Sequence, residues 1–121
     1  MKETVAVVGA SRKPDRYSNK AILKLKAAGH TVIPVNPVEP VIEGLKVSPS
    51  LKDIAGKIDT VTMYVNPVQG EKLVNEILDI NPSRVIFNPG TESETMIDKL
   101  SAAGVKCMRA CTLVLLSTNQ F

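Results

Sequence analysis

Short apolar runs alternate with amphipathic stretches along the whole chain. The apolar runs lack the polar alternation of a half-exposed strand, which is typical of strands buried on both faces. They cover residues 4–9, 31–35, 60–65, 84–87 and 105–108. The stretches with helical spacing cover residues 18–28, 67–80 and 93–103. This alternation predicts βαβ units, and therefore a single doubly wound α/β domain over residues 1–121, with about five parallel strands and helices on both faces.

Shorter features refine this prediction. Pro34 lies in the second apolar run, and because proline cannot donate a ladder hydrogen bond it predicts an edge strand. An extended piece is expected around Lys46–Val47, and Ser50 followed by Asp53 predicts the capped start of a short helix. The apolar run 113–116 either covers the sheet or forms part of a dimer surface, and so short a stretch does not separate the two.

Asn-Pro pairs follow three of the predicted strands. Ligands of doubly wound sheets bind outside the carboxyl ends of the strands. These ends lead into Asn36-Pro37, Asn66-Pro67 and Asn88-Pro89. Each Asn can bind a ligand or cap the following turn, and for a single pair the turn is the better interpretation. Three pairs at one edge shift the balance towards binding.

The loop after the first strand is the strongest single feature. Gly9 allows a tight turn and a close approach of the backbone to a diphosphate, while Ser11, Lys13 and the first N–H groups of the next helix can hold the anion. The loop is neither a Gly-x-Gly-x-x-Gly fingerprint nor a Walker loop. The place after the second strand, where NAD-binding domains carry an acidic residue, holds Asn36. A neutral amide beside a basic loop suits a ribose with an additional phosphate.

Positive charge is concentrated in the same region. The formal net charge is +3, but residues 1–30 hold seven basic and two acidic side chains, whereas residues 31–121 are net negative. The early excess includes Arg12, Lys13 and Arg16, which predicts an anion site. A nucleic-acid surface is not predicted, because basic residues are too few elsewhere and aromatic residues make up only 3%.

Metal and membrane functions find no support in the sequence. Cys107 and Cys111 are four residues apart, which matches neither redox nor zinc spacing, so free thiols and no metal site are expected. No apolar run reaches the ~18–20 residues that span a bilayer. The N-terminus shows no signal peptide, so the expected compartment is cytoplasmic, without a membrane partner.

Six ordered segments form a pattern that covers the chain. They are residues 5–11, 32–37, 43–46, 50–54, 88–92 and 110–116. Together they resemble the CoA-binding domain family, whose domain also forms the nucleotide-binding part of succinyl-CoA synthetase and of ADP-forming acyl-CoA synthetases. The resemblance implies a Rossmann-like fold that binds coenzyme A.

The resemblance also implies roles for candidate binding residues. The phosphates would be held by Gly9, Ala10, Ser11, Arg12 and Lys13. These residues and Arg16, which the charge distribution adds, form the basic loop. The adenine would be bordered by Val35, Asn36 and Pro37. The pantetheine path would be lined by Tyr64, Asn66, Pro67, Asn88, Gly90 and Thr91.

Catalytic groups are sparse. The only histidine, His30, is expected at the opposite edge of the sheet, so Ser11 has no base within reach and a phosphohistidine mechanism is not expected. Cys111 lies near Arg109 in sequence and is either a small buried residue or a thiol that faces CoA and forms a mixed disulfide. The sequence therefore favours a binding module over an enzyme.

Three functions stay open. The first is a CoA-binding module that acts as a carrier, sensor or regulatory partner. The second is an NAD(P)-binding redox-linked protein, and the third is a ligase subunit that supplies the CoA site to a separate catalytic chain. The sequence does not distinguish CoA from acyl-CoA, and it leaves open a protein partner or a homo-oligomer.

Overall fold

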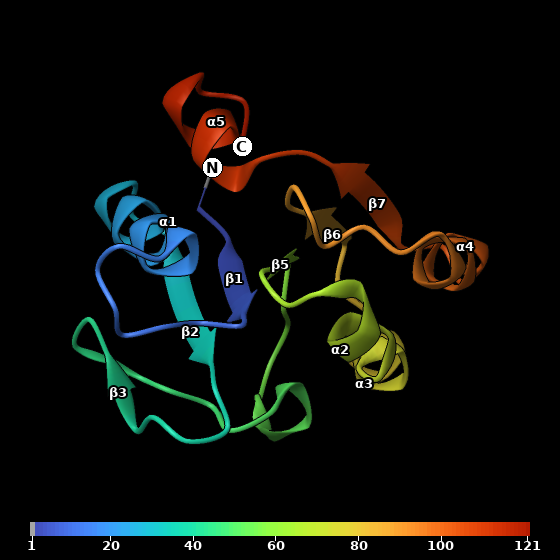
Figure 1. Ribbon diagram of the computed structural model, residues 1–121, viewed down its shortest axis with the longest axis horizontal. Coiled ribbons are helices and arrows are strands. Elements are labelled where there is room, and N and C mark those ends of the chain that lie inside the picture. Colours follow the sequence, from blue (N-terminus) through green and yellow to red (C-terminus); the bar gives the residue numbers. More distant parts are fainter. Residues whose placement is uncertain (1) are drawn as a thin grey trace.

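Five parallel strands form the centre of the computed structural model, which describes residues 2–121 (Figure 1). The strands are β1 (Thr4–Val8), β2 (Thr31–Val35), β5 (Thr60–Met63), β6 (Arg84–Phe87) and β7 (Lys106–Arg109). Their order across the sheet is β2-β1-β5-β6-β7, and every neighbouring pair is parallel. The predicted α/β fold class is confirmed, and each strand lies within two residues of its predicted bounds.

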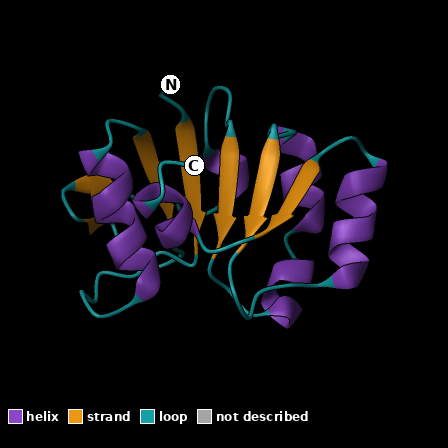
Figure 2. Ribbon diagram, turned by 90° about the horizontal axis from the view of Figure 1, so that it is seen from above, coloured by secondary structure: helices purple, strands orange, loops and turns teal. Residues whose placement is uncertain are grey.

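Helices cover both faces of this sheet (Figure 2). One face carries α1 (Tyr17–Ala27) and α5 (Thr112–Ser117), and the other carries α2 (Pro67–Glu71), α3 (Val74–Ile80) and α4 (Glu94–Ala102). Successive side chains of β1 enter different apolar clusters. Val5 and Val7 pack with α1 residues such as Ile22, whereas Ala6 and Val8 belong to the cluster of α3 and α4. Burial on both faces explains why the run has no polar alternation.

The strand order reverses at β1. After β2 the chain returns to the other side of β1, where β5 pairs with it in parallel from Val5↔Thr60 to Val8↔Met63. The carboxyl ends of β1 and β5 therefore flank the switch point, at which the following loops diverge to opposite faces. Doubly wound sheets bind ligands at such a crevice.

The edge at β2 has more structure than the sequence indicated. Pro34 does lie in an edge strand, as predicted, and its carbonyl accepts a hydrogen bond of 2.9 Å from the Ser48 N–H. The expected extended piece is one arm of a hairpin formed by β3 (Val41–Ile42) and β4 (Leu45–Lys46). Its turn residues Glu43 and Gly44 both have positive φ, as a tight two-residue hairpin turn requires.

The short helix after this hairpin differs from the prediction in its cap. The 3-10 helix η1 (Leu51–Asp53) begins after Ser50, whose hydroxyl donates to the Asp53 carboxylate at 2.8 Å instead of capping a backbone N–H. The predicted pair Ser50 and Asp53 does interact, but through its two side chains.

The single helix predicted over residues 67–80 is wrong, because the structure divides it into α2 and α3. At the junction the N–H groups of Lys72 and Leu73 bond to carbonyls three residues earlier, which tightens the last turn of α2. Gly70 lies close to the side chains of Met63 and Met96, and glycine also weakens a helix interior. After the break, Val74 and Ile77 of α3 pack into the apolar cluster of Met63 and Met96.

The apolar run 113–116 lies in α5, which packs beside α1 over one face of the sheet. Leu116 contacts the cluster that contains Val5 and Val7, so the run covers the sheet. Val114 remains 55% exposed on the outer side of this helix.

His30 lies at the amino edge of the sheet, as predicted. Its Nδ1 accepts a hydrogen bond of 3.0 Å from the Glu3 N–H, and partial burial lowers its pKa. The ring packs against Phe121, with ring centroids 5.1 Å apart. This histidine is therefore separated from the carboxyl edge by the length of the strands.

Candidate functional site

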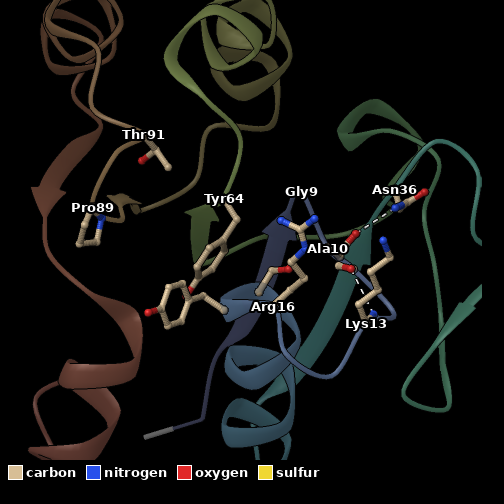
Figure 3. Close-up of a pocket in the computed structure, with 11 residues that line it drawn as sticks. Gly9, Ala10, Lys13, Arg16, Asn36, Tyr64, Pro89 and Thr91 are labelled. Atoms are coloured by element: carbon tan, nitrogen blue, oxygen red, sulfur yellow. Dashed lines mark hydrogen bonds between the residues drawn. The ribbon is translucent and has the colours of Figure 1, made fainter.

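A cavity of about 430 Å³ opens at the switch point (Figure 3). It is lined by Gly9, Ala10, Ser11, Lys13, Arg16, Tyr17, Ser18, Asn36, Tyr64, Pro89 and Thr91. In Figure 3, Asn36 and Lys13 lie on one side, Pro89 and Thr91 on the other, and Tyr64 between them. The loops after β1, β2, β5 and β6 thus meet at one cavity, as the rule for doubly wound sheets predicts.

Gly9 allows two walls of this cavity to approach each other. Its φ is +85°, and a Cβ built on it would lie 2.8 Å from the carbonyl oxygen of Tyr64. The Tyr64 N–H donates to the Val8 carbonyl at 2.8 Å, which holds the segment after β5 against the end of β1. Only glycine combines this left-handed conformation with so close a backbone neighbour.

The basic loop provides two cations to the cavity. Lys13 and Arg16 are exposed, and neither forms an ion pair with any residue between 2 and 121. Arg12 differs, because its Nε lies 3.3 Å from a carboxylate oxygen of Glu39, and it does not line the cavity. The loop itself is ordered by turns, in which the Lys13 N–H donates to the Ser11 hydroxyl at 3.1 Å. Two unpaired cations beside exposed backbone suit a phosphate-bearing ligand.

The side-chain amides of Asn36 and Asn66 serve turns. Asn36 Nδ2 donates to the Ala10 carbonyl at 2.9 Å, and its Oδ1 accepts the N–H groups of Val38 and Glu39. Asn66 caps α2, since its Oδ1 accepts the Gln69 N–H at 2.9 Å. Asn36 still borders the cavity through its position, whereas Asn66 lies outside the lining.

Asn88 follows β6 and forms hydrogen bonds to the end of β5 and to the start of α5. Its Nδ2 donates to the Thr62 hydroxyl at 2.7 Å and to the Met63 carbonyl at 2.8 Å, and its Oδ1 accepts the Thr112 N–H at 2.8 Å. The side chain is almost fully buried. These bonds join the ends of β5 and β6 to the start of α5, which positions the residues on both sides.

A second, more apolar cavity of about 270 Å³ adjoins the first. It is lined by Tyr17, Tyr64, Asn88, Pro89, Cys111 and Leu113. Three residues line both cavities, namely Tyr17, Tyr64 and Pro89. The basic loop borders the first cavity, the second is more apolar, and the two lie side by side at these three residues.

Tyr64 places a buried phenol between the two cavities. Burial raises the pKa of Tyr64 to about 12, and the neighbouring Thr112 and Thr62 hydroxyls only partly offset this rise. The hydroxyl oxygen is buried yet makes no hydrogen bond of good geometry within the described chain. A buried hydroxyl without a partner costs stability, so a ligand that bonded to it would recover that energy.

Comparison with known proteins identifies the family. The pattern of the family described as CoA binding domain matches residues 3–117. The chain belongs to the CoA binding domain family. A Bacillus subtilis (strain 168) relative, the uncharacterized protein YneT, is 33% identical over 100 residues, which cover 83% of this chain and 74% of that protein.

Solved structures share the fold of this chain. The crystal structure of an uncharacterized protein is 38% identical, with a TM-score of 0.93, and the match covers 100% of this chain and 99% of that one. A dinucleotide-forming acetyl-coenzyme A synthetase 1 of Ca. Korarchaeum cryptofilum matches with a TM-score of 0.79 and 21% identity, over 89% of this chain and 25% of the synthetase. That last likeness shows the fold alone.

The structure brings most of the candidate residues of this CoA binding domain together. The first cavity contains Gly9, Ala10, Ser11, Lys13, Arg16, Asn36, Tyr64 and Thr91, and Asn88 lines the second. Outside both linings lie Arg12, Val35, Pro37, Asn66, Pro67 and Gly90. The cavities also include five residues absent from the predicted binding set, namely Tyr17, Ser18, Pro89, Cys111 and Leu113. Tyr17 and Ser18 directly follow the basic loop, so a longer reading of that loop could have found them.

Catalytic and metal-binding groups remain sparse in the part of the chain that the structure describes. No group of three or more His, Cys, Asp or Glu residues between 2 and 121 could hold a metal ion. Arg109, expected near the Cys111 thiol, instead pairs with Glu94. Among the helices of these residues, none has the length and apolar character needed to cross a bilayer.

Proposed function

We propose that this protein binds coenzyme A at the paired cavities and acts as a non-catalytic carrier, sensor or regulatory module. The observation that carries this proposal is the switch-point cavity, where Gly9 opens the backbone and Lys13 and Arg16 are unpaired, in a member of the CoA binding domain family. His30 lies at the far edge of the sheet, so its imidazole does not reach the cavity.

The two cavities suit the two ends of this ligand. The diphosphate lies against the loop 9–13, with Lys13 and Arg16 compensating its charge. The adenine borders residues 35–37 at the end of β2. The pantetheine arm passes Tyr64 and enters the second cavity, whose lining is largely apolar. The amide carbonyl oxygens of the pantetheine arm can accept a hydrogen bond from the Tyr64 hydroxyl.

The region after β2 supports CoA over NAD. An NAD site uses a free carboxylate here to bind the ribose hydroxyls. In this protein Asn36 occupies the place, and the carboxylate of Glu39, three residues later, is paired with Arg12. A ribose that bears a phosphate meets no unpaired acidic side chain at this position.

Calorimetric titration of one protein preparation with CoA, dephospho-CoA and NAD tests the proposal. We expect CoA to bind most tightly, because removal of the 3′-phosphate takes away a charge that the basic loop compensates. Tighter binding of NAD would assign the protein to the NAD(P)-binding class instead. Absence of binding by CoA would overturn the proposed function.

Removal of either unpaired cation should weaken this binding. Lys13→Ala and Arg16→Ala should each cost about 1–2 kcal/mol of CoA binding free energy through the loss of a charge-assisted hydrogen bond. Lys57→Ala is the matched control, since Lys57 is exposed in the loop before β5, at the opposite edge. Titrations at low and high salt should show the difference shrinking as salt screens the exposed charges. Equal affinities for all four proteins would contradict a role for the basic loop.

A further inference from the structure

The apolar end of the second cavity carries a thiol. Cys111 directly precedes α5 and lines this cavity together with Tyr64 and Leu113. Its side chain is partly exposed, which leaves the sulfur accessible from the cavity. The thiol therefore lines the cavity that the proposed pantetheine arm enters, and it is absent from the lining of the cavity beside the basic loop.

The other cysteine has a different environment. Cys107 lies in β7 and packs against the apolar cluster of α3 and α4. Burial raises the pKa of its thiol, and its Sγ lies 3.8 Å from the Val105 carbonyl oxygen. It lines neither cavity. Cys111 is thus the thiol at the cavity, and Cys107 can serve as a control for thiol reactions that do not depend on the cavity.

Two features besides the thiol point to a ligand in this cavity. The Tyr64 hydroxyl oxygen is buried in the wall, close to the Thr62 and Thr112 hydroxyls, and makes no hydrogen bond of good geometry among residues 2–121. The cavity also adjoins, at Tyr17, Tyr64 and Pro89, the cavity that holds Lys13 and Arg16. A molecule with a phosphorylated end and a sulfur-bearing apolar end matches both features at once.

We propose that Cys111 exchanges with the disulfide form of coenzyme A and becomes linked to one CoA molecule through a mixed disulfide. This proposal rests on the proposed function, because the basic loop must first hold the phosphorylated end of CoA disulfide. It adds a covalent, redox-dependent state to the binding site, in which a bound CoA is retained until a thiol releases it.

The exchange balances without any further oxidant. The deprotonated Sγ of Cys111 attacks one sulfur of the CoA disulfide, whose S–S bond breaks as the protein–CoA disulfide forms. The second CoA leaves as a thiolate and takes up the proton that Cys111 lost to solvent. One disulfide is consumed and one is formed. A thiol in excess reverses the reaction by attack on the mixed disulfide.

The test compares two disulfides on the reduced, intact protein. One is CoA disulfide, and the other is the disulfide of pantetheine, which has the same reacting end but lacks the nucleotide and its phosphates. Intact mass followed over time gives the rate of adduct formation, and peptide mapping locates the adduct. We expect CoA disulfide to modify Cys111 about tenfold faster or more, because binding through the phosphates raises the effective concentration of the disulfide.

Variants separate this exchange from unspecific thiol chemistry. Cys107→Ser should retain the adduct, and Cys111→Ser should lose it. The double variant Lys13→Ala/Arg16→Ala keeps Cys111 but should lose the preference for CoA disulfide. Equal rates for the two disulfides, or an adduct mapped to Cys107, would overturn the exchange alone if calorimetry still shows CoA binding. If CoA does not bind at all, the exchange and the proposed function both fail.

Discussion

Gly9→Ala is expected to lower the free energy of unfolding by about 3 kcal/mol, from the left-handed backbone strain of alanine together with overpacking. The new Cβ would lie 2.8 Å from the Tyr64 carbonyl oxygen and 3.0 Å from a methyl group of Val65. The nearest atom belongs to a backbone that is hydrogen-bonded to Val8, so it cannot simply rotate away. The segment after β5 must move instead, and it forms a wall of both cavities.

Gly56→Ala is the control for this prediction. Gly56 has a φ of +89°, close to that of Gly9, but a Cβ built there meets no atom within 4 Å. This variant should therefore cost only about 1–2 kcal/mol, which is the strain of the left-handed conformation. Denaturant titrations of both variants measure the difference, and calorimetry with CoA should show weaker binding for Gly9→Ala alone. If the two variants lose the same stability, the close approach at Gly9 contributes nothing.

The position of the site could be predicted from the sequence because it depends on topology. Apolar runs of four to six residues mark strands buried on both faces, and the carboxyl ends of parallel strands meet at one edge. The loop after Gly9 and the Asn-Pro pairs could therefore be assigned to that edge without side-chain geometry. The same reasoning placed His30 at the other edge, where the structure shows it.

The roles of the asparagine side chains could not be read from the sequence. Asn36, Asn66 and Asn88 are each followed by a proline. A side-chain amide can bind a ligand or cap a turn equally well. The structure gives all three amides partners within the protein. Which carbonyl or N–H group an asparagine amide can reach depends on how the loops pack in three dimensions. Local sequence patterns do not contain this information.

The second cavity could not be predicted from sequence patterns either. It forms where the segments after β5, β6 and β7 converge, and it includes Leu113, which the sequence did not assign to a ligand. The helix break between α2 and α3 has a similar origin. Gly70 is weak as a helix signal on its own, and its contact with Met63 arises only when the helix packs on the sheet.

Asn88→Ala should have the largest effect on stability among the asparagines, about 4 kcal/mol. The substitution leaves the Thr112 N–H and the Met63 carbonyl without their partner on Asn88, and it removes buried side-chain volume. Asn66→Ala is the matched control, because it removes the same side chain before a proline, where it makes one exposed capping bond. That variant should lose only about 1 kcal/mol.

Asn88→Asp distinguishes lost hydrogen bonds from lost packing, since the side chain keeps its shape. A carboxylate at this position faces the Met63 carbonyl and the Thr62 hydroxyl, where the amide now donates two hydrogen bonds. Burial and this repulsion should raise the pKa of the new carboxyl in the folded protein. The folded state then binds a proton more readily than the unfolded state, so the loss of stability should be large at neutral pH and shrink as the pH falls. Unfolding midpoints measured from pH 7 to pH 4 relative to the native protein give this slope. A loss that does not change with pH would show that the amide donors of Asn88 do not hold the ends of β5 and α5 together.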